Sequence, residues 1–413
     1  MKIIALTVVA IFLNPNLLFS QTWQKTYPNI SAVNAITPAL NEGYIVGATL
    51  LNGNGLLMKI DEDGNEVWRR EIPSSKGMII QALIADTVQK CYYFAGSEGF
   101  TFYLSRWPYW NYMKKPSVAL IGKIKDDSNI DWINKDIIDK GYETTSYGRL
   151  QLIGNYVVTS GFSASVKKNN FGGFIHAYDK TTGKLSKTIS TRWYPDFVIW
   201  NKQLIALYKT REGDKYFFTL EQFDENLKSV KKTQGTPLGA LYFNDVRDSY
   251  LLLPNSNDQF SLAFIHALDK VSTYPTIALQ TIMPNSNKPN YPSKVAGVGE
   301  SSVYDKCVLD ADAYLLFTGR HGCTSRDYNC DMAYLKAGSF LETAKAKIFR
   351  YGDYNPSEKN DYPSTIGYDI CPSKDGGAVI VGFATKIYEE NNERFNQSNR
   401  KGWIIKIDSN GNL

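Results

Sequence analysis

Residues 43–50, GYIVGATL, and residues 55–72, GLLMKIDEDGNEVWRREI, decide the fold. Two runs in which apolar residues alternate are followed by the polar turn 61–65, DEDGN, and by a third strand-like run. Alternation with a period of two, interrupted by Gly, Asn and Asp, is typical of β-strands joined by tight turns. The stretch therefore predicts an antiparallel β-meander.

The same pattern recurs along the chain. Close copies lie at 375–385, DGGAVIVGFAT, and at 402–413, GWIIKIDSNGNL, and weaker ones lie at 117–135, 172–189, 216–232 and 260–280. The residues that open the third hairpin turn of each copy are Asp61, Lys125, Asp179, Asp224, Asp269, about Gly338, and Asp408. A repeat of about 40–45 residues is that of a four-stranded propeller blade, and we assign the longer intervals to insertions. The markers predict an all-β fold, a seven-bladed β-propeller with four-stranded antiparallel blades, as a single domain over residues 21–413.

The ends of the chain are predicted to close this ring. The last copy stops at Leu413, where its outer strand would begin. The segment TWQKTYP at 22–28 has the pattern of that outer strand, because Trp23 matches Trp68 and Tyr27 matches the apolar Ile72. We therefore expect the N-terminal strand to pair into the last blade, which would remove an exposed sheet edge.

Residues 1–20 have the features of a secretory signal peptide. Lys2 supplies a positive charge, residues 3–13 are apolar, and Ser20 is a small residue before a cleavage site. We expect export to the periplasm or to the outside of the cell, with a mature chain that begins near Gln21. A lipid anchor is not expected because no Cys lies near this site, and a membrane span is not expected because NPN at 14–16 interrupts the apolar run.

Two of the repeated segments resemble known propeller families. The pattern of DGGAVIVG at 375–382 followed by WIIKIDSNGN at 403–412 is similar to propeller repeats of exported Bacteroidota proteins, and YDKTTGKL at 178–185 resembles the repeat of quinoprotein-type propellers. The resemblance implies a propeller fold and export. The residues that hold the quinone in quinoproteins have no counterpart here, so no cofactor is expected, and neither is the type IX sorting domain that many of these proteins carry.

The charge and the cysteines limit which partners, disulfides and metal sites are expected. The net charge of +5 is small and dispersed, so nucleic acid is not an expected partner. Cys323 and Cys330 could close a small disulfide loop or stay reduced, whereas Cys91, Cys307 and Cys371 sit in apolar runs that favour buried thiols. The sequence contains no CxxC or HExxH pattern, so no metal site is expected.

Insertions in the connecting loops indicate which face of the ring carries the functional surface. In blades with strands A to D, the B–C and D–A connections emerge on one face, and the A–B and C–D turns on the other. The B–C connections are expected to be long at 100–116, 164–171, 319–331 and 386–400, and the D–A connections at 282–302 and 351–365, while the C–D turns stay short. Because loops on rigid scaffolds carry function, we place the functional surface on the B–C/D–A face.

The insertion FTFYLSRWPYWNYMKKP at 100–116 is the main binding candidate. Aromatic rings with nearby donors suit stacking on sugars or anchoring a protein partner. The alternative is that the insertion folds back and buries its own rings as a plug. The candidate binding residues are Arg106, Trp107, Tyr109, Trp110, Tyr112 and, from the blade 6 insertion, Arg320.

A second set marks the start of the innermost strands, at the mouth of the central channel. Its carboxylate and amide oxygens could hold a hard cation, but hydrogen bonding between blades is the favoured interpretation. The set comprises Asn34, Gly148, Asp196, Asn244, Asp305 and Asp369.

The sequence leaves catalysis open and leans against it. His176 and His266 occupy equivalent places in FIHAYDK and FIHALDK, which favours the core, and His321 beside Arg320 is the one histidine left for acid–base work. We expect a non-catalytic protein that binds a glycan or a cell-envelope protein. The alternatives are a carbohydrate-active enzyme, either a glycosidase or a lyase, on the same face and a structural subunit of an envelope or outer-membrane complex.

Overall fold

The computed structural model describes residues 21–99, 117–137, 142–165, 170–191, 195–212, 215–237, 250–254, 260–266, 276–282, 293–295, 302–309, 315–321, 331–337, 343–351, 361–388 and 400–413. Every regular element in these ranges is a β-strand. No helix in them is long and apolar enough to cross a membrane.

These residues form seven four-stranded antiparallel sheets, numbered here 1 to 7 in chain order. Sheets 1 to 3 contain β2 (Ile30–Pro38), β3 (Tyr44–Leu50), β4 (Gly55–Ile60), β5 (Glu66–Ile72); β6 (Met78–Asp86), β7 (Cys91–Glu98), β8 (Val118–Lys125), β9 (Ile130–Ile137); and β10 (Thr144–Ile153), β11 (Tyr156–Ser165), β12 (Asn170–Asp179), β13 (Leu185–Thr191). Sheets 4 to 6 contain β14 (Asp196–Trp200), β15 (Gln203–Glu212), β16 (Lys215–Phe223), β17 (Ser229–Pro237); β18 (Tyr250–Pro254), β19 (Phe260–His266), β20 (Thr276–Ile282), β21 (Ser293–Val295); and β22 (Ser302–Leu309), β23 (Leu315–His321), β24 (Asp331–Ala337), β25 (Thr343–Phe349). Sheet 7 contains β26 (Asp361–Pro372), β27 (Ala378–Tyr388), β28 (Arg400–Ile407) and, from the start of the chain, β1 (Trp23–Tyr27).

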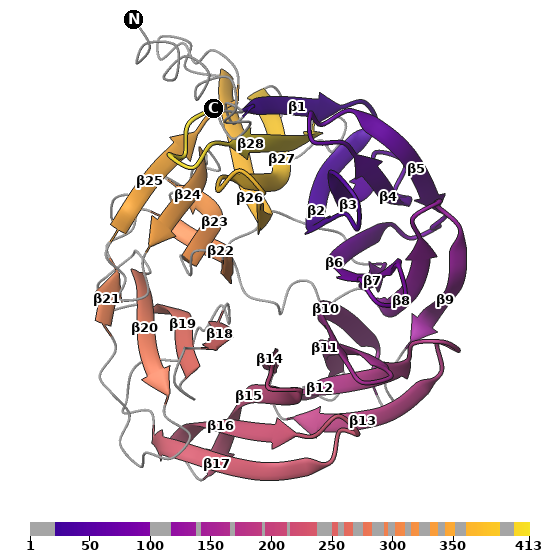
Figure 1. The fold of residues 1–413 in the computed structure, drawn as a ribbon, viewed down its shortest axis with the longest axis vertical. Helices are drawn as coiled ribbons and strands as arrows, with labels where there is room; N and C mark the ends of the chain where they lie inside the picture. The colour runs from indigo at the N-terminus through magenta and orange to yellow at the C-terminus, as the bar shows by residue number, and fades with distance from the viewer. Residues whose placement is uncertain are drawn as a thin grey trace, which may run out of the picture.

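The sheets follow one another around a ring, and the first strand of each meander lies nearest the centre (Figure 1). This arrangement is that of a β-propeller. The predicted all-β class and the four-stranded antiparallel sheets are therefore confirmed.

The N-terminal strand pairs into the last sheet, as predicted. β1 lies antiparallel to β28, with Trp23 opposite Lys406 and Tyr27 opposite Gly402. The outer strand of sheet 1 has the matching register, because Trp68 lies opposite Lys59 and Ile72 opposite Gly55. The two ends of the chain thus build one sheet of the same design as the others.

β1 is also fastened to sheet 1. The Trp23 indole N–H donates to the Glu62 carbonyl at 2.8 Å, and the Tyr27 hydroxyl donates to the Gly64 carbonyl at 2.7 Å. Gly64 has a φ of 73°, and a Cβ placed on it would lie 2.8 Å from the Trp23 ring. A glycine is therefore required at this position for two reasons, the left-handed backbone and the close approach of the ring.

The same contact recurs between sheets 2 and 3. The Trp132 ring covers Gly183, and its indole N–H donates to the Lys180 carbonyl at 3.4 Å. Between sheets 1 and 2 the corresponding turn has Ser128 at a φ of 70° in place of glycine. There the Trp68 indole nitrogen is buried and has no hydrogen-bond partner among the described residues.

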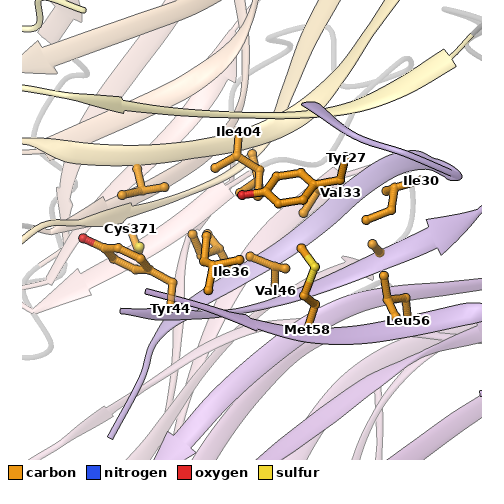
Figure 2. Close-up of a cluster of buried hydrophobic side chains, with 14 of the residues drawn as sticks. Tyr27, Ile30, Val33, Ile36, Tyr44, Val46, Leu56, Met58, Cys371 and Ile404 are labelled. Carbon is orange, nitrogen blue, oxygen red and sulfur yellow. The ribbon is translucent and has the colours of Figure 1, made fainter. Parts of the chain in front are cut away.

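The core lies between neighbouring sheets rather than in a single centre. Figure 2 shows one such cluster, in which Tyr27, Val33, Val46, Met58 and Ile404 point toward one another from β1, β2, β3, β4 and β28. All five side chains are buried. Because burying a large apolar side chain stabilises a fold by roughly 1.5–3 kcal/mol, these shared clusters hold each sheet to the next.

Sheet 5 differs from the prediction. The run at 260–266 was expected to be a third strand, but it forms β19, the second strand of its sheet. Asp269 therefore falls between the second and third strands, outside the described residues, and does not open the third hairpin turn. His266 is not equivalent to His176, which lies on the third strand β12. Alternating apolar residues identify a strand but not its place in a meander, which explains the error.

The insertions near sheet 5 are also reassigned. β21 lies inside the segment 282–302, which was predicted to be a long D–A connection. The long connection is 283–292, between the third and fourth strands, so the C–D turns are not short throughout. The four predicted B–C insertions do fall between second and third strands, although β-strands extend into the predicted ends of three of them, 164–171, 319–331 and 386–400.

Candidate functional site

The structure fixes both ends of the aromatic insertion on the B–C/D–A face. Glu98 ends β7 and pairs with Val118, which begins β8. The Gly99 N–H donates to the carbonyl of Gly77 in the connection between β5 and β6, at 2.8 Å. The carbonyl of Ser117 accepts from the N–H of Thr145 in sheet 3, at 3.0 Å. The predicted binding residues Arg106, Trp107, Tyr109, Trp110 and Tyr112 lie outside the described residues.

A polar surface surrounds this attachment point. We call it the platform, and define it as residues 51–54, 73–77, 98 and 99. Asn54 Oδ1 accepts from the Ser74 N–H at 3.0 Å, and Ser74 Oγ donates to Glu98 at 2.7 Å. The Gly53 carbonyl accepts from the Met78 N–H at 2.8 Å, which ties the platform to the start of β6.

The platform presents polar groups to solvent. Asn52, Ser75 and Lys76 are exposed, while Asn54 and Ser74 are half-buried and hold the two connections together. Amide, hydroxyl and ammonium groups can donate to or accept from the hydroxyl groups of a saccharide. The platform was not predicted, because single Asn and Ser residues in short turns carry no specific signal for binding.

Three of the predicted channel residues are engaged within the protein. Asp369 accepts from the Ile36 N–H at 3.0 Å and so links the innermost strands of sheets 7 and 1. Asp196 forms an ion pair of 2.9 Å with Arg149 of sheet 3. Asn34 donates to Thr49 within sheet 1 at 3.0 Å.

The interpretation that channel residues bond between blades is therefore confirmed for Asp369 and Asp196. Asn244 lies outside the described residues, and Asp305 lies on β22 without a described side chain. Among the described residues, no three His, Cys, Asp or Glu side chains are grouped so that they could hold a metal ion.

The innermost strands share a feature that the sequence analysis did not identify. Five of them contain a register shift, or β-bulge, at Asn34, Gln81, Gly148, Asp305 or Tyr368, and β2 has a second shift between Ile30 and Ala32. Four of these bulges follow a pair that includes a glycine of the second strand; these glycines are Gly96, Gly161, Gly319 and Gly382. The recurring glycine was the available sequence signal, and bulges re-aim side chains, which places Gln81 and Tyr368 among the candidate channel residues.

The structure describes the side chain of His176 but not that of His321. His176 is buried, and its Nδ1 shares a hydrogen bond of 2.8 Å with the Tyr147 hydroxyl, so its predicted core position is confirmed. Arg320 and His321 end β23 without described side chains, and their use in catalysis stays the alternative to the non-catalytic role that we predict.

The cysteines are described in part. Cys91 and Cys371 are buried free thiols, as predicted, and burial raises the pKa of both. Cys307 lies on β22 without a described side chain. Cys323 and Cys330 lie outside the described residues, so their disulfide stays a prediction.

The opposite face contains paired charges. Lys59 of sheet 1 forms an ion pair of 2.8 Å with Asp126 of sheet 2, and Asp126 also accepts from the Tyr92 hydroxyl at 2.8 Å. Burial raises the pKa of Asp126, but the hydrogen bonds from Lys59, Tyr92 and Asn41 outweigh it and hold that pKa below its ordinary value. This carboxylate has a structural role, because its partners come from two neighbouring sheets.

Fold and surface together define a class: a β-propeller with a polar platform at the point where the chain enters the insertion 100–116. No protein-family model and no curated protein matches the sequence. The chain is similar to a solved protein of unknown function from Dyadobacter fermentans, with a TM-score of 0.47, 9% identity and coverage of 81% of this chain and 96% of that one. A protein of unknown function from Bacteroides caccae gives a TM-score of 0.40 and 12% identity over 71% and 88% of the two chains. The β-propeller domain of the Trilobed protease from Pyrococcus furiosus gives 0.44 and 9% over 90% and 98%.

Proposed function

We propose that the seven sheets are the blades of one closed propeller, which is exported and binds a glycan or a cell-envelope protein through its B–C/D–A face without catalysing a reaction. The observation that carries the proposal is the anchoring of the insertion 100–116. The residues on either side of it are held by backbone hydrogen bonds, Gly99 to Gly77 and Ser117 to Thr145. Gly77 lies in the connection between sheets 1 and 2, and Thr145 lies in sheet 3. The residues that flank the insertion are therefore attached at two points on this face.

The chemistry of the platform favours a saccharide as the first ligand to test. Sugars are recognised by aromatic rings that stack on their apolar faces and by fixed polar groups that meet their hydroxyls. The insertion contains the rings, the platform contains the polar groups, and the insertion begins directly after Gly99 of the platform.

The test compares three proteins on a glycan array and in a pull-down from cell envelopes: the wild type, the double variant W107A/W110A, and V88A as the control. Val88 is fully exposed in the turn between β6 and β7, on the opposite face. We expect W107A/W110A to lose binding and to melt within a few degrees of the wild type, and V88A to bind normally.

Two results would contradict the proposal. Turnover of any glycan by the wild type would favour the enzyme. A collapse of stability in W107A/W110A would favour the alternative in which the insertion is a plug.

Export is tested separately, by N-terminal sequencing of the mature protein, which is expected to begin near Gln21.

A further inference from the structure

Arg400 occupies an unusual place for a charged residue. It begins β28 and pairs with Thr385 near the end of β27, so it lies at the B–C end of sheet 7. Gly402, two residues further and on the same side of the strand, packs against Ile30 and Val33 of sheet 1. Arg400 thus faces the junction between the last and the first sheet, and only 7% of its surface is exposed.

The surroundings of the guanidinium are aromatic and apolar. Its carbon lies 5.2 Å from the centre of the Phe383 ring, and Phe383 is fully buried. The Tyr368 ring lies 5.6 Å from Phe383 and belongs to the bulge of β26. Ala32 of sheet 1 packs in the same cluster.

Arg400 makes no hydrogen bond or ion pair with any residue that the structure describes. By contrast, Arg149, at the junction of sheets 3 and 4, is paired with Asp196 at 2.9 Å. Arg350 and Arg69 also have carboxylate partners. Arg400 therefore combines burial with a full set of five unused N–H donors.

Such an arrangement has a clear energetic cost. Removing a cation from water without a partner is unfavourable, and a contact with an aromatic ring offsets only part of that cost. Burial lowers the pKa of Arg400, yet a guanidinium stays charged at neutral pH. A bound anion would remove this cost.

We propose that Arg400 is the recognition site for the carboxylate of an acidic saccharide. A guanidinium that stacks on a ring leaves its in-plane N–H groups for a planar partner, and a carboxylate matches this fork with two parallel hydrogen bonds. The assignment rests on the proposed glycan-binding function and narrows it to uronic acids.

The test uses probes that differ only in the acidic group. Galacturonate and galactose are titrated into wild type, R400M and R149M, with inorganic sulfate as a third probe, and binding is followed by calorimetry and by the melting temperature. We expect galacturonate, but not galactose, to bind and stabilise the wild type. R400M should weaken that binding at least about tenfold, because two charge-assisted hydrogen bonds are lost.

The unliganded variants supply a second readout. R400M removes an unpaired buried charge, so its melting temperature should equal or exceed that of the wild type. R149M removes the ion pair of the buried Asp196, so it should melt at a lower temperature. A loss in R400M as large as in R149M would overturn the proposal, because it would mean that Arg400 is already neutralised within the protein.

Failure of this inference can be told apart from failure of the proposed function. Binding of neutral glycans that depends on Trp107 and Trp110, with no response to galacturonate, would overturn the carboxylate site and leave the proposed function standing. Equal responses to sulfate and galacturonate would overturn the assignment to a carboxylate. A galacturonate response that R400M abolishes and W107A/W110A retains would support the Arg400 site and contradict the role of the insertion.

Discussion

Gly64 shows how one residue sets the approach of two sheets. It turns the chain between β4 and β5 with a φ of 73°, and the ring of Trp23 from β1 rests on it. Gly77 has a similar φ of 86° in the platform, but a Cβ placed on it would meet nothing within 4 Å. Comparing substitutions at Gly64 and Gly77 therefore separates the cost of the left-handed backbone from the cost of a side chain that clashes with its neighbours.

We predict that G64A destabilises the protein more than G77A. Left-handed backbone costs a residue with a side chain roughly 1–2 kcal/mol, and both variants incur this cost. G64A also forces the Trp23 ring away, which adds roughly 1–3 kcal/mol as for other overpacked sites. Urea denaturation measures both free energies of unfolding, and equal losses would contradict the contact between Trp23 and Gly64.

The surroundings of Trp23 and Trp68 could be predicted from the sequence only in part. The match of Trp23 to Trp68 could be predicted, because TWQKTYP at 22–28 has the pattern of the outer strand EVWRREI at 66–72. Their different hydrogen bonding could not, because each partner carbonyl belongs to the turn of the next sheet along the ring. Ser128 replaces glycine in one of those turns, and the Trp68 indole nitrogen is left without a partner among the described residues.

Among the elements, the third strands are joined to the next sheet by a repeated ion pair. Lys59 on β4 reaches Asp126 in the turn after β8, and Lys406 on β28 lies 3.9 Å from Glu62 in the turn after β4. The two lysines occupy equivalent places, because the registers of β28 with β1 and of β4 with β5 match. The pairs therefore belong to the repeat itself.

We predict that D126N lowers the free energy of unfolding by about 1 kcal/mol at pH 7. The pKa of Asp126 is lower in the folded protein than its ordinary value of 3.8. Its stabilisation is therefore complete above that value and disappears as the pH falls through the lower, folded pKa. Denaturation of both proteins between pH 3 and pH 7 should show the difference shrinking below about pH 4. A constant difference would show that the charge of Asp126 contributes nothing.

The strands of sheet 5 mark the limit of prediction for elements. The apolar run at 260–266 resembles that at 170–176, and both were predicted to be the third strand of a sheet. The structure gives them different places, because a strand's position in a meander is set by how many strands precede it. The segments before 260 have weak patterns, so this number could not be counted correctly.

For the whole molecule, the succession of four-stranded sheets and the pairing of β1 with β28 could be predicted, because they follow from repetition and from the match between the two ends. The candidate site could be predicted only in part. The spacing of the repeats indicated which face has the insertions, but the Arg400 site depends on a contact between residues such as Ala32 and Phe383, which lie at opposite ends of the sequence. No local pattern encodes that contact.

The measurement that tests the account most directly is the melting temperature of the mature chain without residues 21–28. These residues contain all of β1, including the buried Tyr27. Their loss removes the fourth strand of sheet 7 and its fastening to Glu62 and Gly64. K25A is the control, because it keeps β1 and removes two contacts of the Lys25 ammonium, an exposed hydrogen bond to Asn65 and a cation–π contact with the Trp23 ring.

We predict a fall of at least about 5 °C for the truncated chain and almost no change for K25A. The truncated chain should also associate, because β28 becomes an exposed edge. A truncated chain that melts with the wild type would contradict closure of the ring by its own ends.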